Sequence, residues 1–428
     1  MQQFDVIILG AGAAGLLCAI EAGKRGRRVL VLDHADRVGK KILISGGGRS
    51  NFTNLHCTSD NFLSENPHFA KSPLARFTPE DMVALVEKHS IPYHEKTLGQ
   101  LFCDRSSRDL VSMLERECDS ANVRLQLETT VHCVERARGT QQDGFTLQSS
   151  HGVLQAQSVV VATGGLSIPK MGATGFGYEL ARQFGLRIVP CRPGLVPFTF
   201  APEDREAWCD LAGVSAEAVV RLGPPPGQSS TVPQPQPPTQ TRTLRSRTSA
   251  AQRFREKILI THRGLSGPAT LQISSFWTGG EPIEVDLAPD LNLFAPLLAP
   301  HAQRDSGAAL QAIRTLLPSR WAERWLSLHA GQSGAMKSGN GDLTNASIAA
   351  LESQLHAWQV IPAGTEGYSK AEVTVGGVDT SELDARTMEA KRVPGLFFIG
   401  EVVDVTGWLG GFNFQWAWAS GFSAGQVV

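Results

Sequence analysis

Six residues near the start of the chain have the types and spacing of a phosphate-binding turn. Gly10 to Gly15 read Gly-Ala-Gly-Ala-Ala-Gly, follow the strand-like run Val6 to Leu9, and open an Ala- and Leu-rich segment typical of a helix. Gly12 would let the backbone approach a pyrophosphate, while the flanking glycines allow a tight turn and close helix packing. Asp33 ends the next apolar run, where a carboxylate binds ribose hydroxyls. Together these features predict dinucleotide binding.

A second glycine-rich segment follows this carboxylate. Residues 39–51 contain three successive glycines, Gly46 to Gly48, with the cations Lys41 and Arg49 nearby. Three glycines let backbone pass a flat, bulky ligand, and either cation could neutralise a phosphate. The alternative interpretation is a flexible surface loop.

The carboxyl-terminal segment favours a flavin over a nicotinamide. A glycine loop at 407–411 leads into a helix-like segment, whose first N–H groups would stabilise negative charge on a reduced isoalloxazine. The alternative for Trp408, Trp416 and Trp418 is that they are core aromatics, and we favour it for Trp416 and Trp418 because their spacing is helical.

Two more apolar runs, at 158–162 and 395–399, end in glycine-containing sequences at Thr163 and Gly400. Both are typical of central strands of a parallel sheet whose carboxyl ends face a ligand. If they belong to the sheet that begins at Val6, the first domain is discontinuous. We therefore expect a cofactor domain from 1–195 and 371–428, an inserted β domain from 196–290 and 357–370, and a helical subdomain from 291–356.

Length and composition set the class of protein. With 428 residues, 42% hydrophobic and 19% charged, the chain can bury more than one core. A net charge of −1 excludes a long-range field that would attract nucleic acid or membrane to the whole surface. The seven cysteines form no CxxC pair and no metal-ligand spacing, which indicates a reduced, cytoplasmic protein without a metal site. No signal peptide, membrane span or protein partner is predicted.

One stretch of the insert is unusual in composition. Residues 223–251 are dense in Pro, Gln, Ser and Thr, which predicts a mobile loop. The sequence that follows is basic, and it is either a solvated segment or an electrostatic grip on a phosphate backbone. The basic residues are Arg242, Arg245, Arg247, Arg253, Arg255, Lys257 and Arg263.

Motifs along nearly the whole chain closely resemble those of the YhiN-type, or BaiN-like, family of NAD(P)/FAD-dependent oxidoreductases. They lie at 5–54, 161–170, 261–269, 371–379 and 400–421. The resemblance implies an α/β fold: a discontinuous, glutathione-reductase-like Rossmann domain for FAD, with an inserted β domain and a helical subdomain.

The resemblance also implies which residues contact FAD. The first glycine turn would hold the pyrophosphate and Asp33 the ribose, while Val131 would touch adenine through its backbone. Segments from both ends of the chain would cover the rest of the cofactor. The implied residues are Gly10, Gly12, Ala13, Ala14, Gly15, Asp33, Lys40, Lys41, Gly47, Arg49, Asn51, Val131, Thr163, Gly164, Gly165, Glu401, Gly411, Phe412 and Asn413.

Two features separate this chain from a generic family member. Ser50 replaces the cysteine of the family's usual Gly-Arg-Cys-Asn loop, which puts in doubt any mechanism that needs a thiol there. No second strand-associated GxGxxG is present, so NAD(P)H would visit the flavin only transiently as electron donor. Residues 94–104 and 365–368 are similar to the enterobacterial branch, which includes an enzyme that reduces a uridine of large-subunit ribosomal RNA to dihydrouridine.

Reduced flavin donates hydride to a C=C bond conjugated to a carbonyl, and the second carbon then needs a proton. Cys103 is the candidate proton donor, with a small buried core residue as the alternative. His262 and Arg263 are the candidate substrate contacts, with a packing role as the alternative. The leading function is reduction of uridine in ribosomal RNA. The alternatives are a small-molecule flavoprotein reductase or amine oxidase, and a non-catalytic FAD-binding scaffold.

Overall fold

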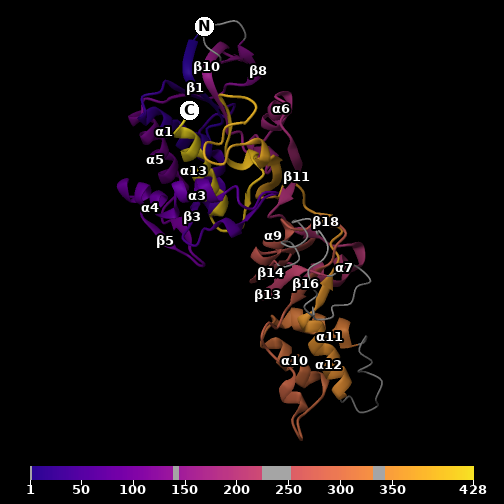
Figure 1. Ribbon diagram of the computed structural model, residues 1–428. Coiled ribbons are helices and arrows are strands. Elements are labelled where there is room, and N and C mark those ends of the chain that lie inside the picture. Colours follow the sequence, from indigo (N-terminus) through magenta and orange to yellow (C-terminus); the bar gives the residue numbers. More distant parts are fainter. Residues whose placement is uncertain (1, 138–143, 224–251, 331–342) are drawn as a thin grey trace, which may run out of the picture. The chain divides into compact units, whose positions relative to one another are not determined.

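The computed structural model describes residues 2–137, 144–223, 252–330 and 343–428 (Figure 1). The chain divides into two compact units: Met1–Pro193 with Glu372–Val428, and Gly194–Ala371. The first unit is therefore built from two separate stretches of sequence. The predicted mobile loop, apart from Gly223, and three of the basic residues, Arg242, Arg245 and Arg247, lie outside the described residues.

A mixed sheet forms the centre of the first unit. Its parallel strands run in the order β7, β2, β1, β10 and β20, and an antiparallel meander of β9 and β8 continues from the first half of β10. The strands are β1 (Gln2–Leu9), β2 (Val29–Leu32), β7 (Arg124–Gln126), β8 (Val131–Ala137), β9 (Gly144–Ser149), β10 (Gly152–Val161) and β20 (Leu396–Phe398).

The apolar runs of the sequence form the buried parallel strands. Residues Val6 to Leu9 are at most 3% exposed, and Val29 to Leu32 at most 2%. A strand covered on both faces needs apolar residues at every position rather than at alternate ones, which is why these runs are unbroken. The predicted α/β class and the Rossmann-like parallel sheet are confirmed.

Helices from both ends of the chain pack together beside this sheet. In Figure 1, α13 (Phe412–Gly425, yellow) lies next to α1 (Ala13–Lys24, indigo). Gly421 faces the Ala14 carbonyl so closely that any side chain there would overlap with it. The other helices of the unit are α2 (Lys40–Ile44), α3 (Lys71–Arg76), α4 (Pro79–Lys88), α5 (Ser107–Ser120) and α6 (Phe176–Gln183).

In the described part of the first unit, three small sheets complete the fold. One joins β3, β6 and β5, the second pairs β21 with β4, and the third pairs β11 with β19. Two of them bring residues from the carboxyl-terminal stretch against the amino-terminal one. Their strands are β3 (Asn51–Asn54), β4 (Phe62–Leu63), β5 (Tyr93–Glu95), β6 (Gln100–Cys103), β11 (Ile188–Gly194), β19 (Val373–Val378) and β21 (Thr406–Gly407).

The second unit contains an antiparallel sheet in the order β17, β16, β13, β14, β15, β12, β18. The strands are β12 (Phe198–Thr199), β13 (Ser215–Leu222), β14 (Arg253–Ile260), β15 (Gly264–Ser266), β16 (Ile283–Asp286), β17 (Trp358–Val360) and β18 (Gly364–Thr365). The helices are α7 (Pro202–Trp208), α9 (Pro268–Ser274), α10 (Ser306–Arg314), α11 (Ser319–Ala330) and α12 (Asn345–His356). Among the described residues, each helix is too short or too polar to cross a lipid bilayer.

One buried carboxylate ties three helices of the first unit together. Glu117 on α5 lies 2.5 Å from Lys88 Nζ and 2.6 Å from His89 Nε2, both at the end of α4, and 3.7 Å from Lys24 Nζ on α1. Burial by itself raises the pKa of this carboxyl, but the bonds from Lys88 and His89 outweigh it and hold the pKa below its usual value near 4.5.

Stability should depend on pH through this group. Because the folded-state pKa is depressed, the carboxylate stabilises the fold above pH 4.5 and loses this effect as pH falls through the folded value. We predict that Glu117→Gln lowers the free energy of unfolding at neutral pH by about 2 kcal/mol. In urea unfolding, the difference in free energy of unfolding between the native protein and the variant should become smaller from about pH 5 towards pH 3. Glu115→Gln, at an exposed position of the same helix, is the control, and a gap that is independent of pH would contradict the assignment.

Candidate cofactor-binding site

The parallel strands bring four separated segments to one edge of the sheet. Asp33 follows β2, Gly10 follows β1, Thr163 lies just beyond β10, and Gly400 just beyond β20. Because parallel strands end at the same edge, these segments lie in a row in the order of the strands. This edge holds most of the residues that the sequence assigned to a cofactor.

The first glycine turn has the shape that a pyrophosphate requires. A side chain at Gly10 would overlap with the Ala162 carbonyl on the neighbouring strand, and one at Gly15 would overlap with the Gly10 carbonyl. A Cβ at Gly12, by contrast, would meet no atom of the described residues within 4 Å. Two glycines are therefore needed for packing, and the third leaves the backbone at Gly12 open to a ligand, while Ala13 and Ala14 are buried.

Asp33 is anchored beside this turn. Its Oδ2 accepts from Ala11 N at 2.7 Å and its Oδ1 from Ala35 N at 2.8 Å. Each carboxylate oxygen has a second lone pair, so the side chain retains acceptors for the two hydroxyls of a ribose. Thr129 N donates to Asp33 O at 2.9 Å, which places Val131, at the start of β8, two residues from this end of the site.

A polar network joins α2 to the far side of the row. Lys41 Nζ donates to Glu401 Oε2 at 2.6 Å and to Ser167 Oγ at 2.7 Å. Glu401 Oε1 accepts from Thr374 N at 2.9 Å and from Ser167 Oγ at 3.1 Å. Lys40 points elsewhere and lies 3.5 Å from Asp36. Ser167 and Thr374 were missed by the sequence analysis as site residues, although both stand inside the motifs that resemble the family.

The segment after β10 carries an unusual polar atom. The Thr163 hydroxyl is buried and has no hydrogen-bond partner among the described residues. Gly164 has φ +74°, and a Cβ there would meet nothing described within 4 Å. Gly165 packs against the side chains of Thr374 and Glu401. A buried hydroxyl without a partner is uncommon and fits a position where a ligand completes the bonding.

The second glycine-rich segment forms a short 3₁₀ turn, η1 (Ser45–Gly48), after α2. Gly47 and Gly48 both have positive φ, and Cβ atoms there would find open space as far as the described residues extend. Arg49 is exposed, and within the described parts of the chain no ion pair is found for it. The segment therefore offers an open backbone and a cation, as expected for a surface that faces a large ligand.

The carboxyl-terminal glycine loop closes against β3. Gly411 packs so closely against the Thr53 carbonyl that a side chain there would overlap with it. With the Asn51 amide turned so that its oxygen faces the loop, this oxygen accepts from Gly411 N at 3.2 Å. Asn54 Nδ2 donates to Gly410 O at 2.8 Å. These contacts hold the two glycine-rich segments side by side although they come from opposite ends of the chain.

The start of α13 follows this loop directly. Gly411, with φ +96°, precedes the helix, and Phe412 is buried against Phe62. The Asn413 side chain bonds Gly407 N at 2.8 Å and Gly407 O at 2.9 Å, so it shapes the loop. The first N–H groups of a helix have no acceptor within the helix, and they give this end a partial positive charge.

The aromatic residues of this helix are part of the core. Trp416 and Trp418 are at most 1% exposed, and their indole N–H groups donate to Gly400 O at 3.0 Å and Phe52 O at 2.8 Å. Gln415 joins Thr53 Oγ1 at 2.7 Å. The interpretation of Trp416 and Trp418 as core aromatics is confirmed.

Cys103 lies on β6, and its N–H donates to Arg49 O at 3.0 Å. The residue is completely buried, and burial raises the pKa of the thiol to about 12, with further help from Asp109 and Asp104. The thiol therefore stays protonated near neutral pH. Ser50 is equally buried, and its hydroxyl lies 3.2 Å from Ser45 Oγ.

His262 and Arg263 belong to the second unit, in the turn between β14 and β15. Thr261 Oγ1 accepts from the backbone N–H groups of Arg263 and Gly264, which shapes the turn. His262 lines an open hollow of about 330 Å³ together with Pro202, Arg205, Glu206 and Cys209.

Part of the basic run is compensated by acidic residues. Arg263 lies 3.7 Å from Glu366, and Arg255 lies 2.6 Å from Asp290. Arg253 and Lys257 are exposed on the same face of β14 as Arg255. In the described part of the run, the two compensated arginines add little free positive charge for a phosphate backbone.

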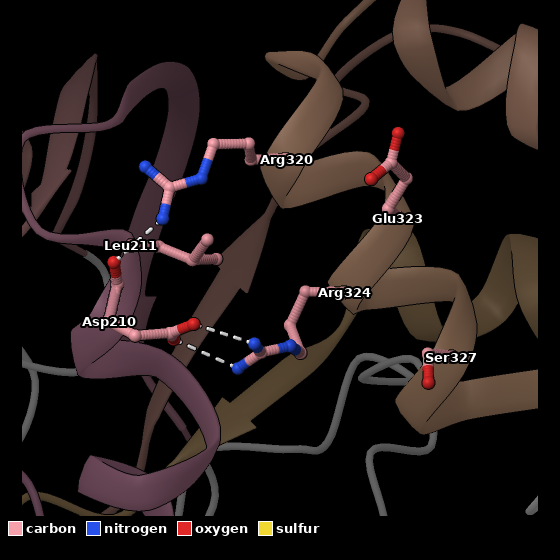
Figure 2. Close-up of a pocket in the computed structure, with 6 residues that line it drawn as sticks. All are labelled: Asp210, Leu211, Arg320, Glu323, Arg324 and Ser327. Carbon is pink, nitrogen blue, oxygen red and sulfur yellow. Dashed lines mark hydrogen bonds and ion pairs between the residues drawn. The ribbon is translucent and has the colours of Figure 1, made fainter.

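Figure 2 shows a second hollow of the same unit, of about 290 Å³, which the sequence did not predict. Asp210 accepts from the Arg324 guanidinium through both carboxylate oxygens, at 2.9 and 2.7 Å. Arg320 donates to the Asp210 carbonyl at 2.9 Å. Since Arg324 is paired and Glu323 lies beside the hollow, its lining is close to charge balance.

The fold and the row of glycine turns define a protein of the Rossmann class with a dinucleotide-type cradle. The HI0933-like protein Rossmann domain matches residues 4–427, and the chain therefore belongs to that family. This confirms the resemblance that its motifs indicated.

Curated relatives cover the chain from end to end. The chain is 47% identical over 426 residues to the ribosomal RNA dihydrouridine synthase of Escherichia coli (strain K12), covering 100% of this chain and 98% of that protein. It is 42% identical over 431 residues to the protein of that name from Haemophilus influenzae, covering 100% and 99%. It is 28% identical over 438 residues to the 3-dehydro-bile acid delta(4,6)-reductase of Clostridium scindens, covering 98% of both chains. These relatives confirm the prediction of an enzyme of the oxidoreductase class.

The three glycines of the first turn provide a test of the cradle. We predict that Gly12→Ala leaves the melting temperature of the apoprotein within a few degrees of native, because its Cβ enters open space, yet weakens binding of FAD at least tenfold. Gly15→Ala is the matched variant and should lower the melting temperature, because its Cβ overlaps with Gly10 O. Thermal unfolding and flavin fluorescence measure the two effects. Equal loss of stability in both variants would contradict the division of roles.

Proposed function

We propose that this protein is an FAD-dependent oxidoreductase that reduces a uridine of large-subunit ribosomal RNA to dihydrouridine, in the cytoplasm and with NAD(P)H as transient electron donor. The observation that carries the proposal is the end-to-end similarity to two ribosomal RNA dihydrouridine synthases. The cradle supports it: a glycine with open space, an anchored carboxylate and a buried hydroxyl without a partner fit the parts of FAD in sequence.

Each part of the cradle has a separate task in this proposal. Asp33 binds the adenosine ribose, and the start of α1 stabilises the pyrophosphate through its N–H groups and partial positive charge. Thr163 and the glycines beside it cover the middle of the cofactor. FAD, when bound and reduced by NAD(P)H, would supply the hydride for the uracil ring, and the N–H groups at the start of α13 would stabilise negative charge on the reduced isoalloxazine.

The proton for the second carbon needs a group that is still protonated near neutral pH. The Cys103 thiol is protonated there and lies on the strand bonded to β3 of the cradle, but a pKa of about 12 makes it a weaker acid than the near-neutral donor that efficient proton transfer favours. His262 and Arg263 are proposed to contact the substrate. Because Cys103 is completely buried, its role as donor stays a prediction that the test below decides.

One relative favours a second candidate function. The bile acid reductase of Clostridium scindens matches 98% of this chain at 28% identity, and an enone and a uracil share the conjugated C=C–C=O unit. A small-molecule enone reductase is therefore the second candidate. It ranks second because the identity to the bile acid reductase is 28%, against 47% to the ribosomal RNA dihydrouridine synthase of Escherichia coli.

The substrate can be tested directly. We predict that disruption of the gene removes the mass of two hydrogen atoms from one uridine of the large-subunit ribosomal RNA, as measured by mass spectrometry of nuclease digests. A plasmid copy should restore it, while a copy carrying Asp33→Ala should not. An RNA mass profile unchanged by disruption would reject the RNA substrate and leave FAD binding intact.

The proton donor has a matched control. Cys118 is also completely buried, and its pKa is likewise raised to about 12 by burial. If Cys103 donates the proton, Cys103→Ser should slow single-turnover reduction of substrate on the order of a hundredfold, with the rate of flavin reduction unchanged. Cys118→Ser should leave both rates within a factor of two. Equal rates in the two variants would assign Cys103 to the core.

A further inference from the structure

The ion pair between Lys41 and Glu401 joins two segments that are 360 residues apart in the chain. Lys41 lies on α2, after the first glycine turn, and Glu401 lies in η7 (Gly400–Val402), directly after β20. The Lys41 side chain is 41% exposed and that of Glu401 18%, so the pair lies at the surface of the cradle. Water screens each charge only in part, so either charge left without its partner would act on a ligand in the cradle.

The order of the strands places this pair on one side of the pyrophosphate. The ribose carboxylate follows β2 and the pyrophosphate turn follows β1, so a cofactor that extends onward along the edge reaches the ends of β10 and β20. Glu401 and Ser167 stand at those ends and draw the Lys41 ammonium towards them. The pair is therefore on the flavin side of the cradle, away from the adenine side.

Lys41 has bonding capacity left for a ligand. An ammonium has three N–H donors, and the contacts found among the described residues, to Glu401 and Ser167, use two of them. Glu401 is more fully used, since Lys41, Ser167 and Thr374 all donate to it. Glu401 thus acts as a positioning residue that fixes the direction of the ammonium.

Other charges nearby do not replace this pair. Lys40, the neighbour on α2, lies near Asp36. Glu372 is an exposed residue, yet the protein around its carboxyl desolvates it and raises its pKa, an effect that Lys41 opposes. Glu401 is the carboxylate that directly contacts Lys41, and the two together carry no net charge.

We propose that Lys41 and Glu401 each act on the reduction potential of the bound flavin, in opposite directions, and that their pairing keeps the two effects in balance. The inference rests on the FAD binding in the proposed function and not on the RNA substrate. Reduction adds negative charge to the flavin, so an uncompensated carboxylate nearby disfavours the reduced form and an uncompensated ammonium favours it. Removing one partner therefore shifts the potential in a direction set by the charge that remains.

The test uses the full chain reconstituted with FAD and equilibrated with a reference dye. Lys41→Gln should weaken binding of reduced FAD about tenfold more than that of oxidised FAD, a fall in potential of about 30 mV for a two-electron couple. Glu401→Gln should raise the potential by a similar amount. In the double variant Lys41→Gln with Glu401→Gln, the ratio of the dissociation constants of reduced and oxidised FAD should return to within threefold of the native value, because no net charge remains at the pair.

Controls separate this effect from structural damage. Lys41→Arg keeps the positive charge, so the ratio of the dissociation constants of reduced and oxidised FAD should stay within threefold of the native value. Lys24→Gln breaks a comparable surface pair with Glu21. Lys24 is the last residue of α1, at the end away from the glycine turn, so this change should leave the reduction potential unchanged. Shifts of the same sign in Lys41→Gln and Glu401→Gln, or no shift in either, would overturn the inference.

The melting temperatures of the apoproteins show whether each variant folds. If Lys41→Gln does not fold, the inference is decided by Glu401→Gln against Ser167→Ala, which removes a neutral bond to the same ammonium and should not move the potential. A native protein that takes up no FAD would overturn this inference together with the cofactor part of the proposed function. FAD uptake without RNA reduction would leave the inference standing.

Discussion

The candidate site depends on the parallel alignment of four strands whose carboxyl ends meet at one edge. Strand direction alone brings Asp33, Gly10, Thr163 and Glu401 into a row, although they are far apart in the sequence. The packing around Gly15 shows how little freedom this alignment has, because a single methyl group there would collide with the turn it supports. The strands determine where these segments lie, and the glycines determine how closely the backbone packs there.

Closure of the cradle depends on a second set of contacts, between β3 and the carboxyl-terminal segment. Asn54 holds Gly410, Thr53 joins Gln415, and Trp418 donates to Phe52 O. These bonds use side chains on one partner and mostly backbone on the other, so they fix the register of the two segments. The result is one cradle built from the two ends of the first unit.

The sequence predicted the parts of the site whose chemistry is local. The glycine turn and Asp33 follow a spacing imposed by one strand and one helix, so they can be recognised without the rest of the fold. The Lys41–Glu401 bond could not be predicted in this way, because it depends on which strand lies beside β10. Asn413 shows the same limit. Its position at the start of a helix could be predicted from the sequence, but its hydrogen bonds to Gly407, which shape the loop, could not. His262 and Arg263 were chosen because they stand beside the basic run, and their roles stay predictions.

The discontinuity of the first unit also has a consequence for biosynthesis. A ribosome makes β1, the glycine turn and β3 early, but α13 is made only after all of Gly194–Ala371. Until then β3 has its strand partner β6 but lacks its contacts with the carboxyl-terminal segment, namely the bonds of Asn54 to Gly410 and of Phe52 to Trp418. The complete cradle can therefore form only after α13 has been made, and a nascent chain that stops earlier carries an open half-cradle that chaperones and proteases can recognise.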